Sequence, residues 1–222
     1  LKEKAMAEDL SERAPDAEGC GGSASAPDPE GFERRVAQYL EWLRVNHYSD
    51  ETRLHRGHHL RHFVAWCAER DLMRPSEVTR AVLERYQGSI FYHRKPNGEP
   101  LSLQSQRTVL TSIRVFFRWL ARQNHLLANP ASEWVLPRFA RRLPKYVLTA
   151  TEAERVINLP DVSTALGLRD RAILEVLYST GMRRMEVIGL RLDDADRERG
   201  TVTIREGKGR RQRVVPIGER AL

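Results

Sequence analysis

The sequence predicts a mainly α-helical chain of two domains, in which a four-helix bundle precedes a smaller α+β unit. Its 222 residues leave room for two modest hydrophobic cores. Apolar residues recur at three- and four-residue spacing through residues 30–127, as amphipathic helices require, and β-branched stretches follow in residues 201–217. We expect a disordered tail over 1–29, a helical domain over 30–127, a linker over 128–146 and a second domain over 147–222.

The charge of the chain is unevenly distributed between the tail and the rest. The formal net charge is +7, but residues 1–30 hold three basic and eight acidic side chains, so the remainder carries +12. That excess favours a polyanionic partner, because neutralising phosphates releases condensed counterions; the alternative is a basic, solvated surface. The tail is rich in Ala, Gly, Ser, Pro and Glu and cannot bury enough apolar surface to fold.

No feature of the sequence indicates export or membrane insertion. No apolar run approaches the ~20 residues of a membrane span, and no secretory signal is visible, so a cytoplasmic location is expected. Cys20 and Cys67 lie in unlike contexts and resemble neither a disulfide framework nor a metal site. We expect both to be free thiols.

Four helices are predicted in the first domain, with start signals for two of them. Apolar spacing from Phe32 predicts the first helix, and Ser49 is typical of the N-cap of a second. A third helix is expected around residues 82–86, and a turn with Pro and Gly follows at residues 95–100. Ser102 begins a long fourth helix, whose predicted core face consists of Val109, Leu110, Ile113, Phe116, Phe117 and Leu120.

The second domain is expected to begin at Thr149, which forms a capping-box pattern with Glu152. Before it, residues 137–144 form a basic linker that lies along a phosphate backbone or is a solvated hinge. Residues 169–178 are predicted to form a buried helix that Gly181 terminates, and a further helix begins at residue 183. The β-branched stretches at 201–204 and 213–217 predict a β-hairpin.

Arg183 follows the glycine at the junction of two predicted helices, where backbone amides favour anions. Its guanidinium is always charged and can bind two phosphate oxygens at once, so it is a candidate to stabilise a pentacoordinate phosphate. A structural ion pair with Glu186, three residues further along the same helix face, is the alternative.

Lys208 stands between two glycines near the predicted hairpin turn, where its ammonium can approach another surface. A lysine there can donate a proton to a leaving alkoxide, as general acid catalysis requires. The alternative is a basic tip, formed by Lys208, Arg210, Arg211 and Arg213, that only binds backbone phosphate.

Together these motifs closely resemble the tyrosine recombinase (phage integrase) family, especially its bacterial Xer-like members. The resemblance rests on residues 174–194 and 207–217, and it extends back through the helix ending at Leu120 and through Asn129-Pro130-Ala131. It covers about residues 30–222 and implies an N-terminal core-binding (SAM-like) DNA-binding domain. The second domain would then be the α+β first part of the recombinase catalytic domain, with a hairpin or a three-stranded sheet.

The resemblance also implies roles for individual residues. The arginine matching Arg183 binds the scissile phosphate in that family, the glutamate matching Glu186 supports the site, and the lysine matching Lys208 protonates the 5′-oxygen. Family members continue with a His-x-x-Arg box, a further His or Trp and a tyrosine nucleophile, none of which follows Lys208 in this sequence. We therefore expect a DNA-binding fragment that is inactive alone.

His58-His59-Leu60-Arg61-His62 matches the missing box letter for letter but precedes Arg183. Motif order excludes it, so we expect His58, Arg61 and His62 to form a polar helix face. All six tyrosines precede Lys208, and Tyr178 is expected to pack in the core. None of them is a credible nucleophile.

The partner implied by the resemblance is double-stranded DNA. Arg107 and Arg114 lie two helical turns apart and would share the DNA-facing side of the fourth helix, although a solvated face is the alternative. The reaction of the family needs no metal or nucleotide cofactor, because a 3′-phosphotyrosine bond conserves the energy of the broken phosphodiester. Full-length members act as homotetramers on two DNA sites, but the C-terminal segment that links their protomers is not seen here. The main alternative function is a non-catalytic DNA-binding regulator derived from a recombinase.

Overall fold

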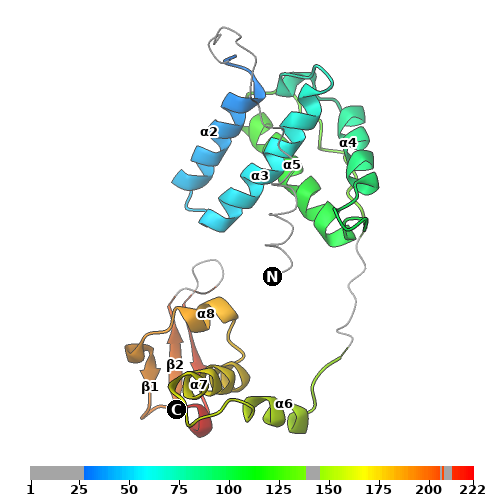
Figure 1. Ribbon diagram of the computed structural model, residues 1–222. Helices are drawn as coiled ribbons and strands as arrows, with labels where there is room; N and C mark the ends of the chain where they lie inside the picture. The colour runs from blue at the N-terminus through cyan, green and yellow to red at the C-terminus, as the bar shows by residue number, and fades with distance from the viewer. Residues whose placement is uncertain (1–27, 139–145, 206, 208–211) are drawn as a thin grey trace. The chain divides into compact units, whose positions relative to one another are not determined.

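The computed structural model describes residues 28–138, 146–205, 207 and 212–222 (Figure 1). The chain forms two compact units, Leu1–Arg141 and Arg142–Leu222. The predicted tail up to residue 27, the linker arginines Arg141 and Arg142, and the hairpin residues 208–211 lie outside the described residues.

Among the described residues of the first unit, four α-helices form a bundle, as the sequence predicts. They are α2 (Phe32–Val45), α3 (Asp50–Ala68), α4 (Arg80–Tyr92) and α5 (Leu103–Arg122), with a short 3-10 helix η1 (Pro75–Glu77) before α4. Ser49 caps α3 by accepting a hydrogen bond from the Thr52 amide at 3.3 Å, and Ser102 caps α5 through the Ser105 amide at 3.1 Å. Both predicted N-caps are confirmed.

The core of the first unit forms around α5. All six apolar residues predicted for its core face are buried, and they pack with Tyr39, Phe63 and Leu83 from the other three helices. Ala131 and Trp134, which the sequence places in the expected linker, are also buried in this core. Residues that follow α5 therefore complete the packing of the bundle.

The part of the second unit that the structure describes contains three α-helices and a three-stranded sheet. The helices are α6 (Ala150–Ile157), α7 (Ala165–Thr180) and α8 (Arg184–Ile188), and the strands are β1 (Ala195–Asp196), β2 (Thr201–Ile204) and β3 (Arg213–Pro216). Short 3-10 helices η2 (Leu192–Asp194) and η3 (Glu219–Ala221) flank the sheet. The strands are antiparallel in the order β1-β2-β3, so the three-stranded form of the prediction is confirmed.

The Thr149 cap of α6 is confirmed, because Thr149 Oγ1 accepts from the Glu152 amide at 3.3 Å and Glu152 Oε2 accepts from the Thr149 amide at 2.9 Å. The predicted burial of α7 is wrong. The one residue of α7 classed as buried is Glu175, whereas Ile173 is 39% and Tyr178 61% exposed. Among the described residues, α6, α8, β3 and η3 pack against α7, and they cover Leu174, Val176 and Leu177 only in part.

Two smaller expectations concern membranes and thiols. In the described part of the chain, every helix is too short or too polar to cross a bilayer.

Cys67 is a free thiol in the core of the first unit, and burial raises the pKa of this thiol to about 12. It is therefore protonated and inert at neutral pH.

Candidate functional site

Arg183 stands at the start of α8. The two residues before it, Gly181 and Met182, determine where it lies. Gly181 ends α7 in the left-handed region at φ +60° and ψ +23°, which glycine adopts without steric cost. Met182 is buried with Val202 and Ile204 of β2, so the turn is anchored on the sheet. The Arg183 side chain is 60% exposed, so the anchored turn presents a charged group to solvent.

Glu186 lies one turn further along α8 and connects two arginines. Its side chain is only 3% exposed. Oε1 accepts from Nη1 of Arg183 and from Nη1 of Arg213, both at 2.9 Å. Oε2 accepts from the Arg183 amide at 2.9 Å and from Nη2 of Arg213 at 2.7 Å. Both carboxylate oxygens are therefore shared between Arg183 and Arg213.

These bonds keep Glu186 ionised. Hydrogen bonds from the Arg213 side chain, then the Arg183 amide and the Arg183 guanidinium, lower the pKa of the Glu186 carboxyl to about 2, against an opposing effect of burial. The carboxylate thus remains negative throughout the neutral range. A fixed carboxylate that orients an exposed arginine is an arrangement suited to holding an anion at the guanidinium.

The structure brings three of the predicted site residues together and leaves others apart or undescribed. Arg183, Glu186 and Arg213 form one cluster, whereas Lys208, Arg210 and Arg211 lie outside the described residues. The predicted ion pair between Arg183 and Glu186 is present at 2.9 Å. The ion pair leaves the Arg183 guanidinium accessible to solvent. Pairing with Glu186 is therefore compatible with binding a phosphate at the same guanidinium.

Arg107 and Arg114 belong to α5 in the first unit. Arg107 is exposed, and its Nη1 donates to the Pro137 carbonyl at 2.9 Å, which ties the segment after the bundle to the helix. Arg114 is half-buried on the same helix. The two residues lie seven positions apart on α5, so they share one face of the helix.

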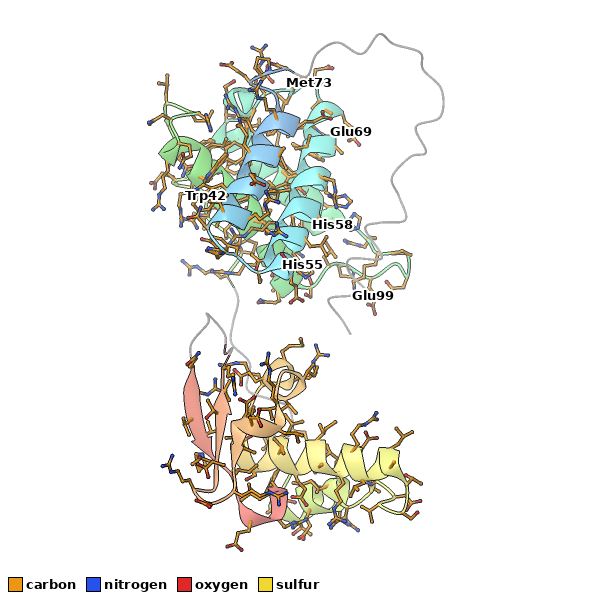
Figure 2. The ribbon with its side chains drawn as sticks, turned by 90° about the vertical axis from the view of Figure 1, so that its left-hand side faces the viewer. Trp42, His55, His58, Glu69, Met73 and Glu99 are labelled. Carbon is orange, nitrogen blue, oxygen red and sulfur yellow. The ribbon has the colours of Figure 1, made fainter. Side chains whose placement is uncertain are left out.

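The histidines of α3 divide into a polar face and a core residue. His58 and His62 have ring centroids 4.6 Å apart, and Figure 2 shows His55 and His58 along this helix. His59 is buried instead, with Nδ1 2.9 Å from Ser112 Oγ on α5. Burial, followed by the charges of His58, His55 and His62, lowers the pKa of His59 to about 4. Of the predicted polar face, Arg61 is exposed and His58 and His62 are half-buried, while the neighbouring His59 is a core residue.

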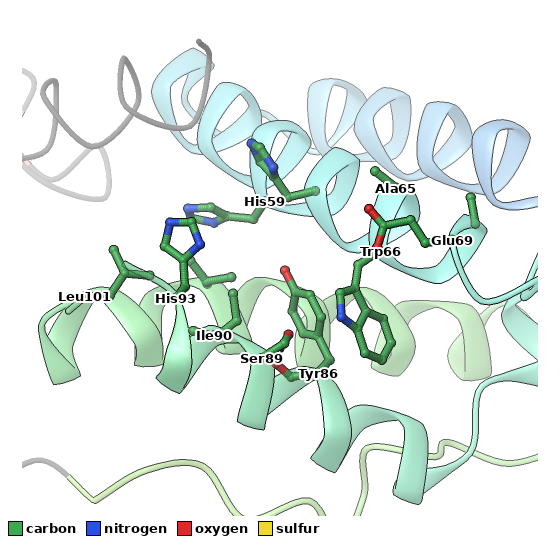
Figure 3. A pocket seen from close by; sticks show the side chains of 12 residues that line it. His59, Ala65, Trp66, Glu69, Tyr86, Ser89, Ile90, His93 and Leu101 are labelled. Atoms are coloured by element: carbon green, nitrogen blue, oxygen red, sulfur yellow. Dashed lines mark hydrogen bonds between the residues drawn. The ribbon is translucent and has the colours of Figure 1, made fainter. Parts of the chain in front are cut away.

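A pocket of about 570 Å³ opens between α3, α4 and the start of α5 (Figure 3). Trp66, Tyr86, Ile90 and Leu101 form much of its wall, and His59 also lines it. None of its described lining residues is an arginine or lysine. The pocket therefore lacks the chemistry of a phosphate site.

Long-range bonds in the second unit stabilise the elements around Arg183, and sequence reasoning missed them. Arg220 of η3 donates Nε to Glu175 of α7 at 2.9 Å, and the Gly218 amide donates to Ser179 Oγ at 2.7 Å. The bonded residues lie 45 and 39 positions apart, so no local spacing could have indicated them. They attach the segment after β3 to the helix that leads to Arg183.

Two family models match the chain. The model described as "Phage integrase, N-terminal SAM-like domain" matches residues 36–125, and the model described as "Phage integrase family" matches residues 146–222. The two matches fall on the two structural units in the same order. The chain belongs to the phage integrase family of tyrosine recombinases.

Curated relatives carry Xer names. Tyrosine recombinase XerC 2 of Ralstonia nicotianae is 51% identical over 189 residues, which is 85% of this chain and 54% of the relative. Tyrosine recombinase XerD of Pseudomonas putida is 32% identical over 189 residues, which is 84% of this chain and 60% of the relative. The chain thus spans a little over half the length of these relatives.

Solved structures share the fold. The Tn1549 transposon integrase in complex with a circular intermediate DNA aligns with a TM-score of 0.60 at 15% identity, over 86% of this chain and 62% of that one. A lambda integrase dimer bound to a core site aligns with a TM-score of 0.59 at 14% identity, over 83% and 59%. At these identities the likeness concerns the fold alone.

Proposed function

We propose that this chain is the DNA-binding part of a site-specific tyrosine recombinase, and that its second unit supplies the phosphate-binding arginine of the active site. The observation that carries the proposal is the exposed Arg183 guanidinium held by the buried, ionised Glu186. Such a pair presents fixed positive charge where a phosphodiester would acquire negative charge during strand transfer.

Similar proteins and charge support duplex DNA as the partner. The integrases that share the fold were solved on DNA, and the curated relatives are named as recombinases. The chain beyond its acidic first 30 residues carries a formal charge of +12. Arg107 and Arg114 on α5, together with Arg210 and Arg211, are the proposed backbone contacts, because arginine binds phosphate oxygens bidentately.

In the proposed reaction Arg183 stabilises the pentacoordinate phosphate, and Lys208 protonates the departing 5′-oxygen. The reaction is a transesterification through a 3′-phosphotyrosine and requires no metal or nucleotide. The nucleophilic tyrosine of the family follows the lysine, and no tyrosine follows Lys208 in this sequence. The 222-residue chain is thus proposed to bind DNA without cutting it, while the full recombinase would act as a tetramer on two sites.

DNA binding is tested with the chain as given and a labelled duplex over a series of salt concentrations. Affinity is expected to fall steeply with salt, and the double substitution Arg107→Glu and Arg114→Glu should weaken binding by about tenfold or more, because each reversal opposes a phosphate. Arg44→Glu is the control, since Arg44 is an exposed arginine of α2 in the same unit. Equal losses in both variants would contradict the assignment to α5.

Cleavage is tested separately with a nicked suicide duplex that traps covalent intermediates. We expect no protein-DNA adduct from the 222-residue chain, because the proposed nucleophile is not among its residues. An adduct that survives denaturation would show that one of the six tyrosines acts as nucleophile, and peptide mapping would identify it. DNA binding without an adduct would also fit the alternative function, a non-catalytic DNA-binding regulator derived from a recombinase.

A further inference from the structure

The Arg213 side chain holds Glu186 more completely than the Arg183 side chain does. Its Nη1 and Nη2 donate to Oε1 and Oε2 at 2.9 and 2.7 Å, which is a two-point fork. The Arg183 side chain contributes one bond, from Nη1 to Oε1 at 2.9 Å. A fork fixes both the plane and the direction of the carboxylate, whereas a single bond fixes neither. The orientation of the Glu186 carboxylate is therefore set mainly by Arg213.

The oriented carboxylate in turn holds Arg183 at two points. Oε2 accepts the Arg183 backbone amide at 2.9 Å, and Oε1 accepts its Nη1 at the same distance. Backbone and guanidinium are thus fixed relative to one carboxylate. With the Arg183 side chain 60% exposed, the rest of its guanidinium can receive a ligand.

The sheet fixes Arg213 itself. Arg213 begins β3 and pairs with Ile204 of β2. Ile204 is buried with Val202 and Met182, so this register cannot shift by one residue without exposing the small core of the unit. In the sequence Lys208 lies between β2 and β3, and β3 starts at the residue that holds Glu186.

We propose that Arg213 is a positioning residue that orients Arg183 through Glu186, and that it does not itself bind the DNA phosphate. The Arg213 side chain is 36% exposed and commits both terminal nitrogens to Glu186. The inference rests on the proposed function only in naming phosphate as the ligand of Arg183. The sequence predicts a direct phosphate contact for Arg213, and the proposal replaces that contact with a positioning role.

Replacing Arg213 with lysine distinguishes a role in phosphate binding from a role in positioning Arg183. An Arg213→Lys chain keeps the positive charge, so a residue that binds phosphate by charge would tolerate the change. A lysine cannot form the fork, because its ammonium is a single point of attachment. A positioning residue would therefore fail in the Arg213→Lys variant even though the net charge is preserved.

The test uses isotope-labelled 222-residue chain and NMR signals of the Arg183 guanidinium and the Glu186 carboxyl. Without ligand, Arg213→Lys is expected to move the Arg183 Nε–Hε signal toward that of a solvated arginine. It should also raise the pKa of the Glu186 carboxyl above its value of about 2. With inorganic phosphate as the probe, the dissociation constant read at Arg183 should rise by about threefold or more.

Arg205→Lys is the matched control. Arg205 follows β2 and donates to Asp194, another almost fully buried carboxylate of the same unit. The substitution removes a comparable arginine–carboxylate bond away from Glu186, so the Arg183 signal and the phosphate affinity should stay as in the unmodified chain. Dispersed amide signals from β2 verify that each variant is folded. Should Arg213→Lys fail to fold, Glu186→Gln replaces it and should displace the Arg183 signal in the same way.

The outcomes separate this inference from the proposed function. An unchanged Arg183 signal in both Arg213→Lys and Glu186→Gln would overturn the positioning role, as would full phosphate affinity in folded Arg213→Lys. If phosphate never affects Arg183 in the unmodified chain but Arg213→Lys still displaces its signal, the positioning role stands and the proposed phosphate site is wrong.

Discussion

Individual buried groups in this protein are stabilised by partners far away in sequence. Glu186 depends on Arg213, 27 residues away, and His59 depends on Ser112, 53 residues away. The two differ in charge state. Glu186 stays ionised because arginines surround it, whereas His59 stays neutral because burial and three neighbouring histidines oppose protonation.

The neutral His59 makes the first unit sensitive to acid. Its pKa is about 4 in the folded protein against an ordinary value of 6.5, so the unfolded chain binds the proton more readily between these values. As pH falls from about 7 to 4, the free energy of unfolding should decrease by about 3 kcal/mol from this group, and below pH 4 its contribution should level off. Urea unfolding measures this through tryptophan fluorescence, because Trp42, Trp66, Trp119 and Trp134 all lie in the first unit.

His59→Leu should remove most of this pH dependence, because the replacement cannot be protonated. His47→Asn is the control, since His47 is exposed and its positive φ of 57° is one that asparagine tolerates. The control should retain the slope of the unmodified chain. A His59→Leu chain with an undiminished slope would place the acid sensitivity in other groups.

At the scale of elements, the junction between α7 and α8 controls where Arg183 lies. Gly181 adopts φ +60° there, and a Cβ at this position would meet no atom within 4 Å. A substitution would therefore be penalised by backbone conformation and not by a clash. The junction also connects α7, which is bonded to η3, with α8, which is bonded to β3. Its geometry therefore affects the attachment of both helices.

Gly181→Ala should lower the stability of the second unit by about 1–2 kcal/mol, because alanine disfavours the left-handed region, and Gly181→Asn should cost less. Gly189→Ala is the control, since Gly189 has φ −85°, which any residue adopts. NMR intensities of β2 amides in urea report this unit, which contains no tryptophan. Equal losses for alanine and asparagine would show that the left-handed conformation is not the cause.

At the scale of the whole molecule, the two units differ in how well they cover their apolar residues. The first unit has a large core with several fully buried aromatic residues. Among the described residues of the second, the core cluster consists of four buried residues, Met182, Val202, Ile204 and Ile217. More than half of the exposed large apolar side chains among the described residues lie in the second unit, although it is the shorter one. Concentrated exposure of this kind marks an interaction surface or an aggregation risk.

The 222-residue chain should therefore bind the dye ANS in its native state. Met185 and Ile188 lie three residues apart on α8 and are both exposed, so replacing both with glutamine should reduce dye fluorescence with little loss of stability. Leu127→Gln in the first unit is the control, because Leu127 is a fully exposed leucine of the better covered unit. If the control lowers the fluorescence as much, the dye does not report the second unit.

Much of the fold was predictable because its signals are local. The caps at Ser49, Ser102 and Thr149 and the spacing of apolar residues in α5 act within one or two helical turns. The burial of α7 was not predictable in this way. Its apolar content suggested a core helix, but burial depends on which elements pack against it, and that is not encoded in the helix itself.

The sequence by itself determined the order of the units, their helices and strands, the family, and the positions of Arg183 and Glu186 as a pair one helical turn apart. Only the tertiary structure decided that Arg213 completes the pair, that His59 is a core residue, and that Ala131 and Trp134 belong to the first unit. The reason is physical. Periodicity and capping act between neighbours along the chain, whereas contacts between distant residues follow from strand register and core packing.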